Sequence, residues 1–118
     1  MHHALDFVEL SGYGRSEQEH GVRFLKDTAL EVRGRHVVLV DEVVDTGLTM
    51  NYLARTLALR EPATLAAVTL FDRPYRRLVD DLPVRYVGFT IPDEFFVGYG
   101  FGLDERWRNL PDLHLVRA

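Results

Sequence analysis

The feature that most constrains this chain is an uninterrupted aliphatic run at residues 37–40, Val-Val-Leu-Val, followed at once by a polar stretch that contains glycine. Such a run is typical of a strand covered on both faces in a parallel sheet. Residues 48–59, with two leucines four positions apart, predict an amphipathic helix that ends before Pro62. Residues 65–71 predict a second buried strand. The order strand, loop, helix, strand indicates a βαβ unit with a right-handed crossover, and hence an α/β fold with a mostly parallel sheet.

Shorter strands are predicted elsewhere, at 4–10, 22–25, 86–90 and 114–116. The segment 11–21 is rich in glycine and charged residues and has almost nothing to bury, so it is expected to form a long mobile loop of the kind that often acts as a lid. No repeat or long linker interrupts the chain. Residues 1–118 are therefore expected to form a single domain.

Composition narrows the functional classes. The 118 residues match the size of one domain with one core. A net charge of -4 supplies no positive field for a phosphate backbone, so nucleic-acid binding is not expected. The chain has 0 cysteines, which excludes disulfides, thiolate metal sites and a cysteine nucleophile. No apolar run approaches the length of a membrane span and the N-terminus lacks a signal-peptide pattern, so a cytoplasmic protein without membrane contact is expected.

The polar stretch after the first buried strand combines groups that suit a sugar phosphate. It lies where a parallel strand ends and a helix begins, a position whose free backbone N–H groups attract phosphate. Gly47 allows close backbone approach, Thr46 and Thr49 add hydroxyl groups, and Asp41 and Glu42 can bind sugar hydroxyls or water on Mg²⁺. A capped loop with solvated acids is the alternative interpretation of the same spacing.

Two segments carry a family resemblance. Residues 38–49, Val-Leu-Val-Asp-Glu-Val-Val-Asp-Thr-Gly-Leu-Thr, resemble the phosphoribosyl-pyrophosphate motif of type I phosphoribosyltransferases. Residues 86–100 and 104–111 are similar to the C-terminal signature of hypoxanthine-guanine phosphoribosyltransferases. The resemblance implies a type I phosphoribosyltransferase fold. It also implies that a 6-oxopurine displaces pyrophosphate from phosphoribosyl pyrophosphate with the help of Mg²⁺, giving a purine nucleotide.

The resemblance also implies roles for individual residues. Asp45 would be the catalytic base or acceptor at the purine N7 and Arg73 would donate to the purine O6. Phe95 would stack on the purine, the backbone of Phe96 would read its edge, and Arg108 would meet the pyrophosphate. The remaining implied roles are ribose and water-mediated metal contacts by Asp41 and Glu42, a 5′-phosphate cradle from Thr46, Gly47, Leu48 and Thr49, and a lid at 11–21.

The chain departs from the family pattern at four places. The family's strand-helix-strand segment with its pyrophosphate-binding loop is expected to be absent before the first strand. A Ser-Tyr pair of the lid corresponds to Gly12-Tyr13, and the lysine that faces the purine corresponds to Arg73. A gapless alignment puts Gly102 where the family has a metal-binding aspartate, whereas a two-residue shift makes Asp104 that ligand.

Three hypotheses follow. The chain is a purine salvage enzyme that works as a homo-oligomer with Mg²⁺, or an impaired relative that only binds phosphoribosyl pyrophosphate or a purine nucleotide, or an incomplete chain whose front another polypeptide supplies. Other conspicuous residues receive structural interpretations. Arg76 and Arg77 are expected in a solvated turn and Trp107 in a packing contact, while His2 and His3 are expected to be start-site residues.

Overall fold

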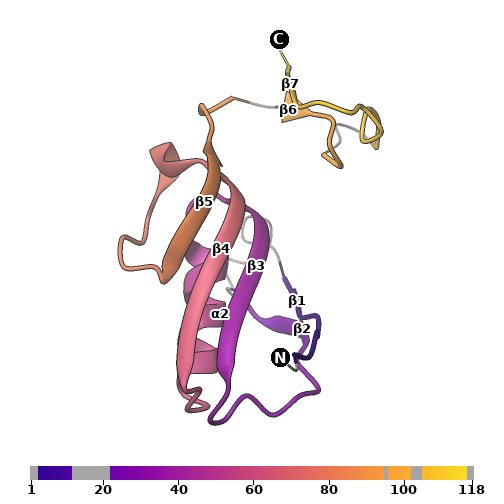
Figure 1. The fold of residues 1–118 in the computed structure, drawn as a ribbon. Helices are drawn as coiled ribbons and strands as arrows, with labels where there is room; N and C mark the ends of the chain where they lie inside the picture. The colour runs from indigo at the N-terminus through magenta and orange to yellow at the C-terminus, as the bar shows by residue number, and fades with distance from the viewer. Residues whose placement is uncertain (1–2, 12–21, 95, 102–104, 117–118) are drawn as a thin grey trace.

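The computed structural model of the chain describes residues 3–11, 22–94, 96–101 and 105–116. Its main sheet consists of three parallel strands, in the order β3 (His36–Val44), β4 (Thr64–Asp72) and β5 (Val84–Thr90). One helix, α2 (Leu48–Ala58), connects β3 to β4 and lies behind the sheet in Figure 1. The predicted α/β fold and its βαβ unit are confirmed.

The remaining elements are short. A 3-10 helix, η1 (Pro74–Arg76), follows β4. Two antiparallel pairs complete the described chain: β1 (Glu9–Leu10) with β2 (Phe24–Lys26), and β6 (Phe96–Val97) with β7 (His114–Leu115). The predicted strands at 22–25 and 114–116 are thus present with boundaries shifted by one or two residues.

The predicted strand at 4–10 is wrong over most of its length, because only its last two residues are in a strand. Asp6 explains the irregular path. Its carboxylate accepts hydrogen bonds from the Thr28 hydroxyl at 2.6 Å and from the Ala29 amide at 2.7 Å. These bonds, with that of Thr28 the strongest, hold the pKa of Asp6 well below its usual range. Local side-chain bonding of this kind competes with strand pairing.

The core lies between α2 and one face of the sheet. The helix buries one stripe of residues, Met50, Leu53, Ala54 and Leu57. They pack with Val32, Leu39, Val44 and Ala67 in one hydrophobic cluster. Each fully buried leucine stabilises the fold by about 1.5–3 kcal/mol. The i, i+3, i+4, i+7 spacing of the helix stripe is therefore what fixes α2 on the sheet.

The other face of the sheet is exposed, which corrects the expectation that residues 37–40 are covered on both sides. Val40, Val68 and Tyr86 form one row across the three strands. Val40 is 80% exposed and Tyr86 is 70% exposed, and Val38 on the same face is 60% exposed. Among the described residues no helix covers this face (Figure 1). An aliphatic run predicts that a strand can be buried, but it does not predict which element covers the strand.

Both outer edges of the three-stranded sheet lack a neighbouring strand within the described ranges, since β4 is the only strand that β3 or β5 pairs with there. The helix found in those ranges falls short of the length and apolar character that a membrane crossing requires.

Candidate functional site

The loop from β3 to α2 forms the site, at the carboxyl end of β3. Gly47 is the last residue before the helix and has a φ of 86°, in the left-handed region that favours glycine. A Cβ atom on Gly47 would lie 2.9 Å from the Leu82 side chain and 3.2 Å from that of Arg77. The backbone conformation therefore favours glycine here, and a Cβ atom would also displace the Leu82 and Arg77 side chains, because the loop backbone lies close to the connection that follows β4.

A small cavity of about 110 Å³ opens at this loop. Its lining residues are Asp41, Val43, Val44, Asp45, Thr46, Gly47, Thr49 and Met50. The structure therefore brings together five predicted site residues, namely Asp41, Asp45, Thr46, Gly47 and Thr49. Leu48, also predicted, begins α2 and donates its amide to the Thr46 hydroxyl at 3.3 Å.

The cavity presents positive backbone groups. In the described part of the chain, no acceptor is recorded for the amides of Thr46 and Gly47. The first turn of α2 contains no acidic residue that would offset the partial positive charge of the helix N-terminus. Free amides and a helix N-terminus together favour an anion, and a phosphate monoester suits a cavity of this size.

The two acids at the end of β3 have different environments. Asp41 lines the cavity and is partly buried, and burial raises the pKa of its carboxyl group. One of its oxygens accepts the Glu42 amide at 2.8 Å. Glu42 is exposed and does not line the cavity. The neighbouring side chains thus diverge as expected for a strand, and a ligand at the cavity would contact Asp41 directly.

Asp45 is paired with Arg73, which comes from the end of β4. The guanidinium group donates from Nη2 at 2.6 Å and from Nε at 3.3 Å to the two carboxylate oxygens. A third bond runs from Nη1 to the carbonyl oxygen of Glu94 at 3.1 Å. The bond to Asp45 raises the pKa of Arg73. The predicted purine-facing cation is therefore next to the predicted base, and it also links that base to the segment before Phe95.

Of the other two arginines of this turn, Arg77 corrects the expectation of a solvated basic turn, whereas Arg76 is exposed as expected. Arg77 donates from Nε to the carbonyl oxygen of Asp45 at 3.1 Å and forms an ion pair with Asp72. Its side chain is only 18% exposed. Arg76 is half exposed and pairs with Asp93 at 2.8 Å. Sequence reasoning missed Arg77 because a run of charged residues after a strand usually lies in solvent, and the sequence does not show which aspartate each arginine pairs with.

The structure does not bring the predicted C-terminal site residues to the small cavity, among those that it describes. Phe95 and Asp104 lie outside the described residues, as does most of the predicted lid. Phe96 belongs to β6 and pairs with Leu115. Arg108 is exposed, with an ion pair to Glu105 at 3.8 Å, and is absent from the residues that line the small cavity.

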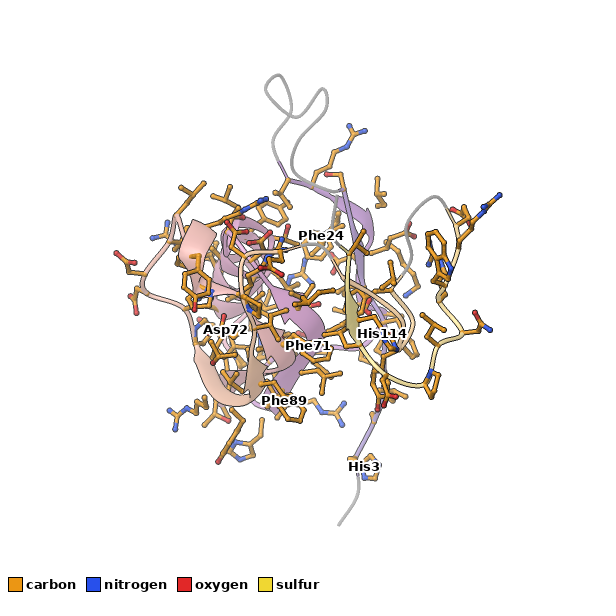
Figure 2. All side chains as sticks on the ribbon, turned by 90° about the horizontal axis from the view of Figure 1, so that it is seen from above. His3, Phe24, Phe71, Asp72, Phe89 and His114 are labelled. Carbon is orange, nitrogen blue, oxygen red and sulfur yellow. The ribbon has the colours of Figure 1, made fainter. Side chains whose placement is uncertain are left out.

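Aromatic contacts connect the C-terminal segment to the sheet. The Phe71 ring lies 6.1 Å from that of Phe89 and 5.8 Å from that of Phe101, measured between ring centroids. Phe71 and Phe89 lie side by side in Figure 2, on neighbouring strands. This cluster positions residues 96–101 near the end of β4, on the side where Arg73 reaches Glu94.

A second, larger cavity of about 1160 Å³ lies beside β3. It is lined by residues 36–41 of β3, by Thr49, Met50, Leu53 and Leu57 of α2, and by much of the N-terminal segment. Asp41, Thr49 and Met50 line both cavities. The small cavity thus adjoins, at these three residues, a larger and mainly apolar space beside β3, a feature that the expectation of a covered strand did not include.

The residues at the site fit Mg²⁺ in part. Within the described ranges, no three His, Cys, Asp or Glu side chains gather into a metal site. Mg²⁺ commonly binds one or two carboxylates and completes its shell with water and substrate phosphates. Asp41 supplies a carboxylate oxygen of this kind at the cavity and Glu42 supplies one outside it, so a metal that arrives with its substrate would find one carboxylate at the cavity itself.

Comparison with known proteins agrees with this geometry. The family model for the phosphoribosyl transferase domain matches residues 4–106. Hypoxanthine phosphoribosyltransferase of Salmonella typhimurium is 46% identical over 110 residues, which cover 92% of this chain and 61% of that protein. Hypoxanthine-guanine phosphoribosyltransferase of Bacillus subtilis is 38% identical over 114 residues, covering 96% and 63%. The chain spans about three fifths of the length of these relatives.

Solved structures give the same result. A hypoxanthine-guanine phosphoribosyltransferase from Bacillus anthracis superimposes with a TM-score of 0.82 at 42% identity, over 95% of this chain and 66% of that one. A point mutant of hypoxanthine phosphoribosyltransferase from Trypanosoma cruzi, in a ternary complex with substrates, has a TM-score of 0.83 at 39% identity, over 95% and 60%. The chain belongs to the phosphoribosyl transferase family and, within it, to the hypoxanthine-guanine phosphoribosyltransferases of the type I fold.

Proposed function

We propose that this protein is a purine phosphoribosyltransferase of cytoplasmic purine salvage, which transfers the 5-phosphoribosyl group from phosphoribosyl pyrophosphate to hypoxanthine or guanine. The observation that carries the proposal is the small cavity in which two backbone amides, which have no acceptor among the described residues, lie beside Asp41 and Asp45. Relatives named as enzymes of this reaction support it. So does the Trypanosoma cruzi relative, which is described in complex with its substrates and with the product IMP.

The cavity would hold the 5′-phosphate. The amides of Thr46 and Gly47 and the hydroxyls of Thr46 and Thr49 would donate to its oxygens. Asp41 and Glu42 would accept the ribose hydroxyls and bind water on Mg²⁺. When bound, Mg²⁺ would neutralise charge on the pyrophosphate group. Holding the sugar in this way places C1 of the ribose next to the purine, so that the purine displaces pyrophosphate within one bound complex and no chance encounter of the two substrates is needed.

Asp45 and Arg73 would meet the purine together. Asp45 would accept the proton from N7 as the ring nitrogen that attacks C1 gains positive charge. Arg73, already bonded to both oxygens of that carboxylate, would donate to the purine O6. A guanidinium fork is wider than the ammonium group that the family resemblance implies at this position, so purine selectivity would depend on its geometry.

A coupled assay tests this function. The protein is incubated with hypoxanthine, guanine or xanthine, phosphoribosyl pyrophosphate and Mg²⁺, and nucleotide formation is followed by absorbance. The matched control is Asp45→Asn, which keeps the shape of the side chain and removes its charge. Turnover of the wild-type protein well above that of the control is expected, and equal rates would refute the function.

A binding protein is the second candidate, and one observation favours it. All residues that line the small cavity fall within positions 41–50, so no described residue from another part of the chain helps to enclose it. Such a site would still hold a nucleotide phosphate without enclosing the pyrophosphate. Calorimetry with IMP, GMP and phosphoribosyl pyrophosphate distinguishes the two, because binding without turnover supports this candidate and absence of binding removes both.

We also propose that the protein associates with itself. The row of Val40, Val68 and Tyr86 leaves an exposed apolar surface that is larger than single apolar residues on a soluble protein. Light scattering on the wild-type protein should give a mass above that of the monomer, and Val40→Lys should lower it. A wild-type monomer would contradict this association.

A further inference from the structure

The connection from β4 to β5 follows the outer side of the loop at the small cavity. The amide of Leu78 donates to the Thr46 carbonyl oxygen at 2.8 Å, and Arg77 Nε donates to the Asp45 carbonyl oxygen at 3.1 Å. One position further along, the Cα atom of Gly47 faces the side chains of Leu82 and Arg77. Three consecutive loop residues are therefore held by one neighbouring segment.

Arg77 is itself held in place. Its Nη2 atom forms an ion pair with Asp72 at the end of β4, while its own amide donates to the Pro74 carbonyl oxygen at 3.1 Å. The two charged side chains are 18% and 20% exposed. A partly buried guanidinium that bridges a carboxylate and a carbonyl oxygen has little freedom to rotate, because its Nε and Nη2 atoms are bonded to two different acceptors.

The planarity of the peptide bond connects these contacts to the cavity. In a trans peptide the C=O and N–H groups point in opposite directions, and no cis peptide occurs in the described chain. The Asp45 carbonyl shares its peptide plane with the Thr46 amide, and the Thr46 carbonyl shares its plane with the Gly47 amide. Turning both carbonyls toward residues 77 and 78 therefore turns both amides away from them. Thr46 and Gly47 line the small cavity, and no acceptor for either amide is recorded among the described residues.

We propose that Arg77 is a positioning residue, which orients the amides of Thr46 and Gly47 toward an anion in the small cavity by holding the Asp45 carbonyl on the opposite side. The proposal rests on the proposed function, because the 5′-phosphate of a purine nucleotide is the anion concerned. Arg77 touches no ligand in this arrangement and acts through the backbone. Lysine at this position would keep the charge, but a single ammonium group lacks the fork that reaches both the Asp72 carboxylate and the Asp45 carbonyl.

The test compares two ligands that differ only in the phosphate. IMP and inosine are titrated by calorimetry into wild-type protein, Arg77→Lys and a control, Arg76→Lys, whose half-exposed side chain pairs with Asp93 instead. Arg77→Lys should bind IMP about tenfold more weakly, as expected for a weakened charged hydrogen bond, with inosine binding unchanged. Arg76→Lys should bind both as the wild type does. Equal losses for IMP and inosine would overturn the proposal, because they would indicate a general structural defect.

A measurement without ligand separates this proposal from the proposed function. In ¹H–¹⁵N spectra, Arg77→Lys should shift the amide resonances of Thr46 and Gly47 more than Arg76→Lys does. If the wild-type protein binds no IMP, the proposed function fails and these resonances alone decide the role of Arg77. If Arg77→Lys does not fold, Asp72→Asn releases the other end of the bridge and should give the same two changes. Resonances and IMP affinity that stay at wild-type values in the folded variant would overturn the role of Arg77.

Discussion

Replacing Gly47 by alanine tests the loop geometry directly, with Gly34→Ala as a matched control. Both glycines have positive φ, 86° and 71°, so both substitutions place a Cβ atom in the left-handed region, at a cost of about 1–2 kcal/mol. Around Gly34 a new Cβ atom would meet no other atom within 4 Å. At Gly47 it would lie 2.9 Å from Leu82 Cδ1 and 3.2 Å from Arg77 Cδ, and such overpacking adds about 1 kcal/mol or more.

Urea denaturation followed by circular dichroism measures the difference. Gly34→Ala should lower the free energy of unfolding by about 1–2 kcal/mol and Gly47→Ala by about 2–3 kcal/mol. Only Gly47→Ala should also weaken IMP binding, because relief of the contact moves the loop backbone away from the connection that holds it. Equal destabilisation by the two substitutions, together with unchanged IMP binding, would refute the close approach described for Gly47.

Three further substitutions test other parts of the structure. Burial raises the pKa of Asp41, so the folded protein binds this proton more tightly than the unfolded chain does, and the ionised carboxylate lowers stability. Asp41→Asn should therefore raise Tm at about pH 7, and this gain should disappear toward about pH 4. A lower Tm of the variant at about pH 7 would contradict the effect of burial on Asp41. Leu57→Ala should cost about 2–5 kcal/mol in urea denaturation, whereas the exposed Leu59→Ala should cost less than about 0.5 kcal/mol, and similar values would exclude the core described here. Arg73→Gln should lower the free energy of unfolding by about 1–2 kcal/mol because it leaves Asp45 without its charged partner, and an unchanged value in thermal unfolding would show that the pair adds no stability.

The part of the fold predicted from sequence is the part in which local pattern and long-range packing agree. Three sequence patterns predicted β3, α2 and β4 to within a few residues: the aliphatic run, the leucine spacing of the helix and the second apolar run. Each pattern has the apolar spacing that its own type of element needs to bury one or both faces. The cavity residues between 41 and 49 were predictable for the same reason, since the site lies where a strand, a loop and a helix follow each other directly in sequence.

The remaining features depend on residues far apart in the chain. The hydrogen bonds of Asp6 to residues 28–30, more than twenty positions away, hold residues 4–8 in an irregular path where a strand was predicted. Arg77 reaches the carbonyl of Asp45 across 32 positions. Whether the sheet face that carries Val40 is exposed depends on which elements pack against the sheet. Periodicity in a single sequence contains none of this information, because it describes what a residue can bury and not what lies opposite.

The position of β4 between its two neighbours has a consequence for local unfolding. Each amide of a central strand can bond to one neighbour or the other, whereas β3 has, within the described chain, one side without a partner strand. Hydrogen exchange should therefore be slowest in β4 and faster for those amides of β3 that face outward. The cavity loop continues from β3, the less protected strand, so its resistance to opening depends on α2 and on the connection after β4. The groups proposed to bind phosphate are therefore expected to exchange with solvent through less costly openings than the amides of β4 beside them.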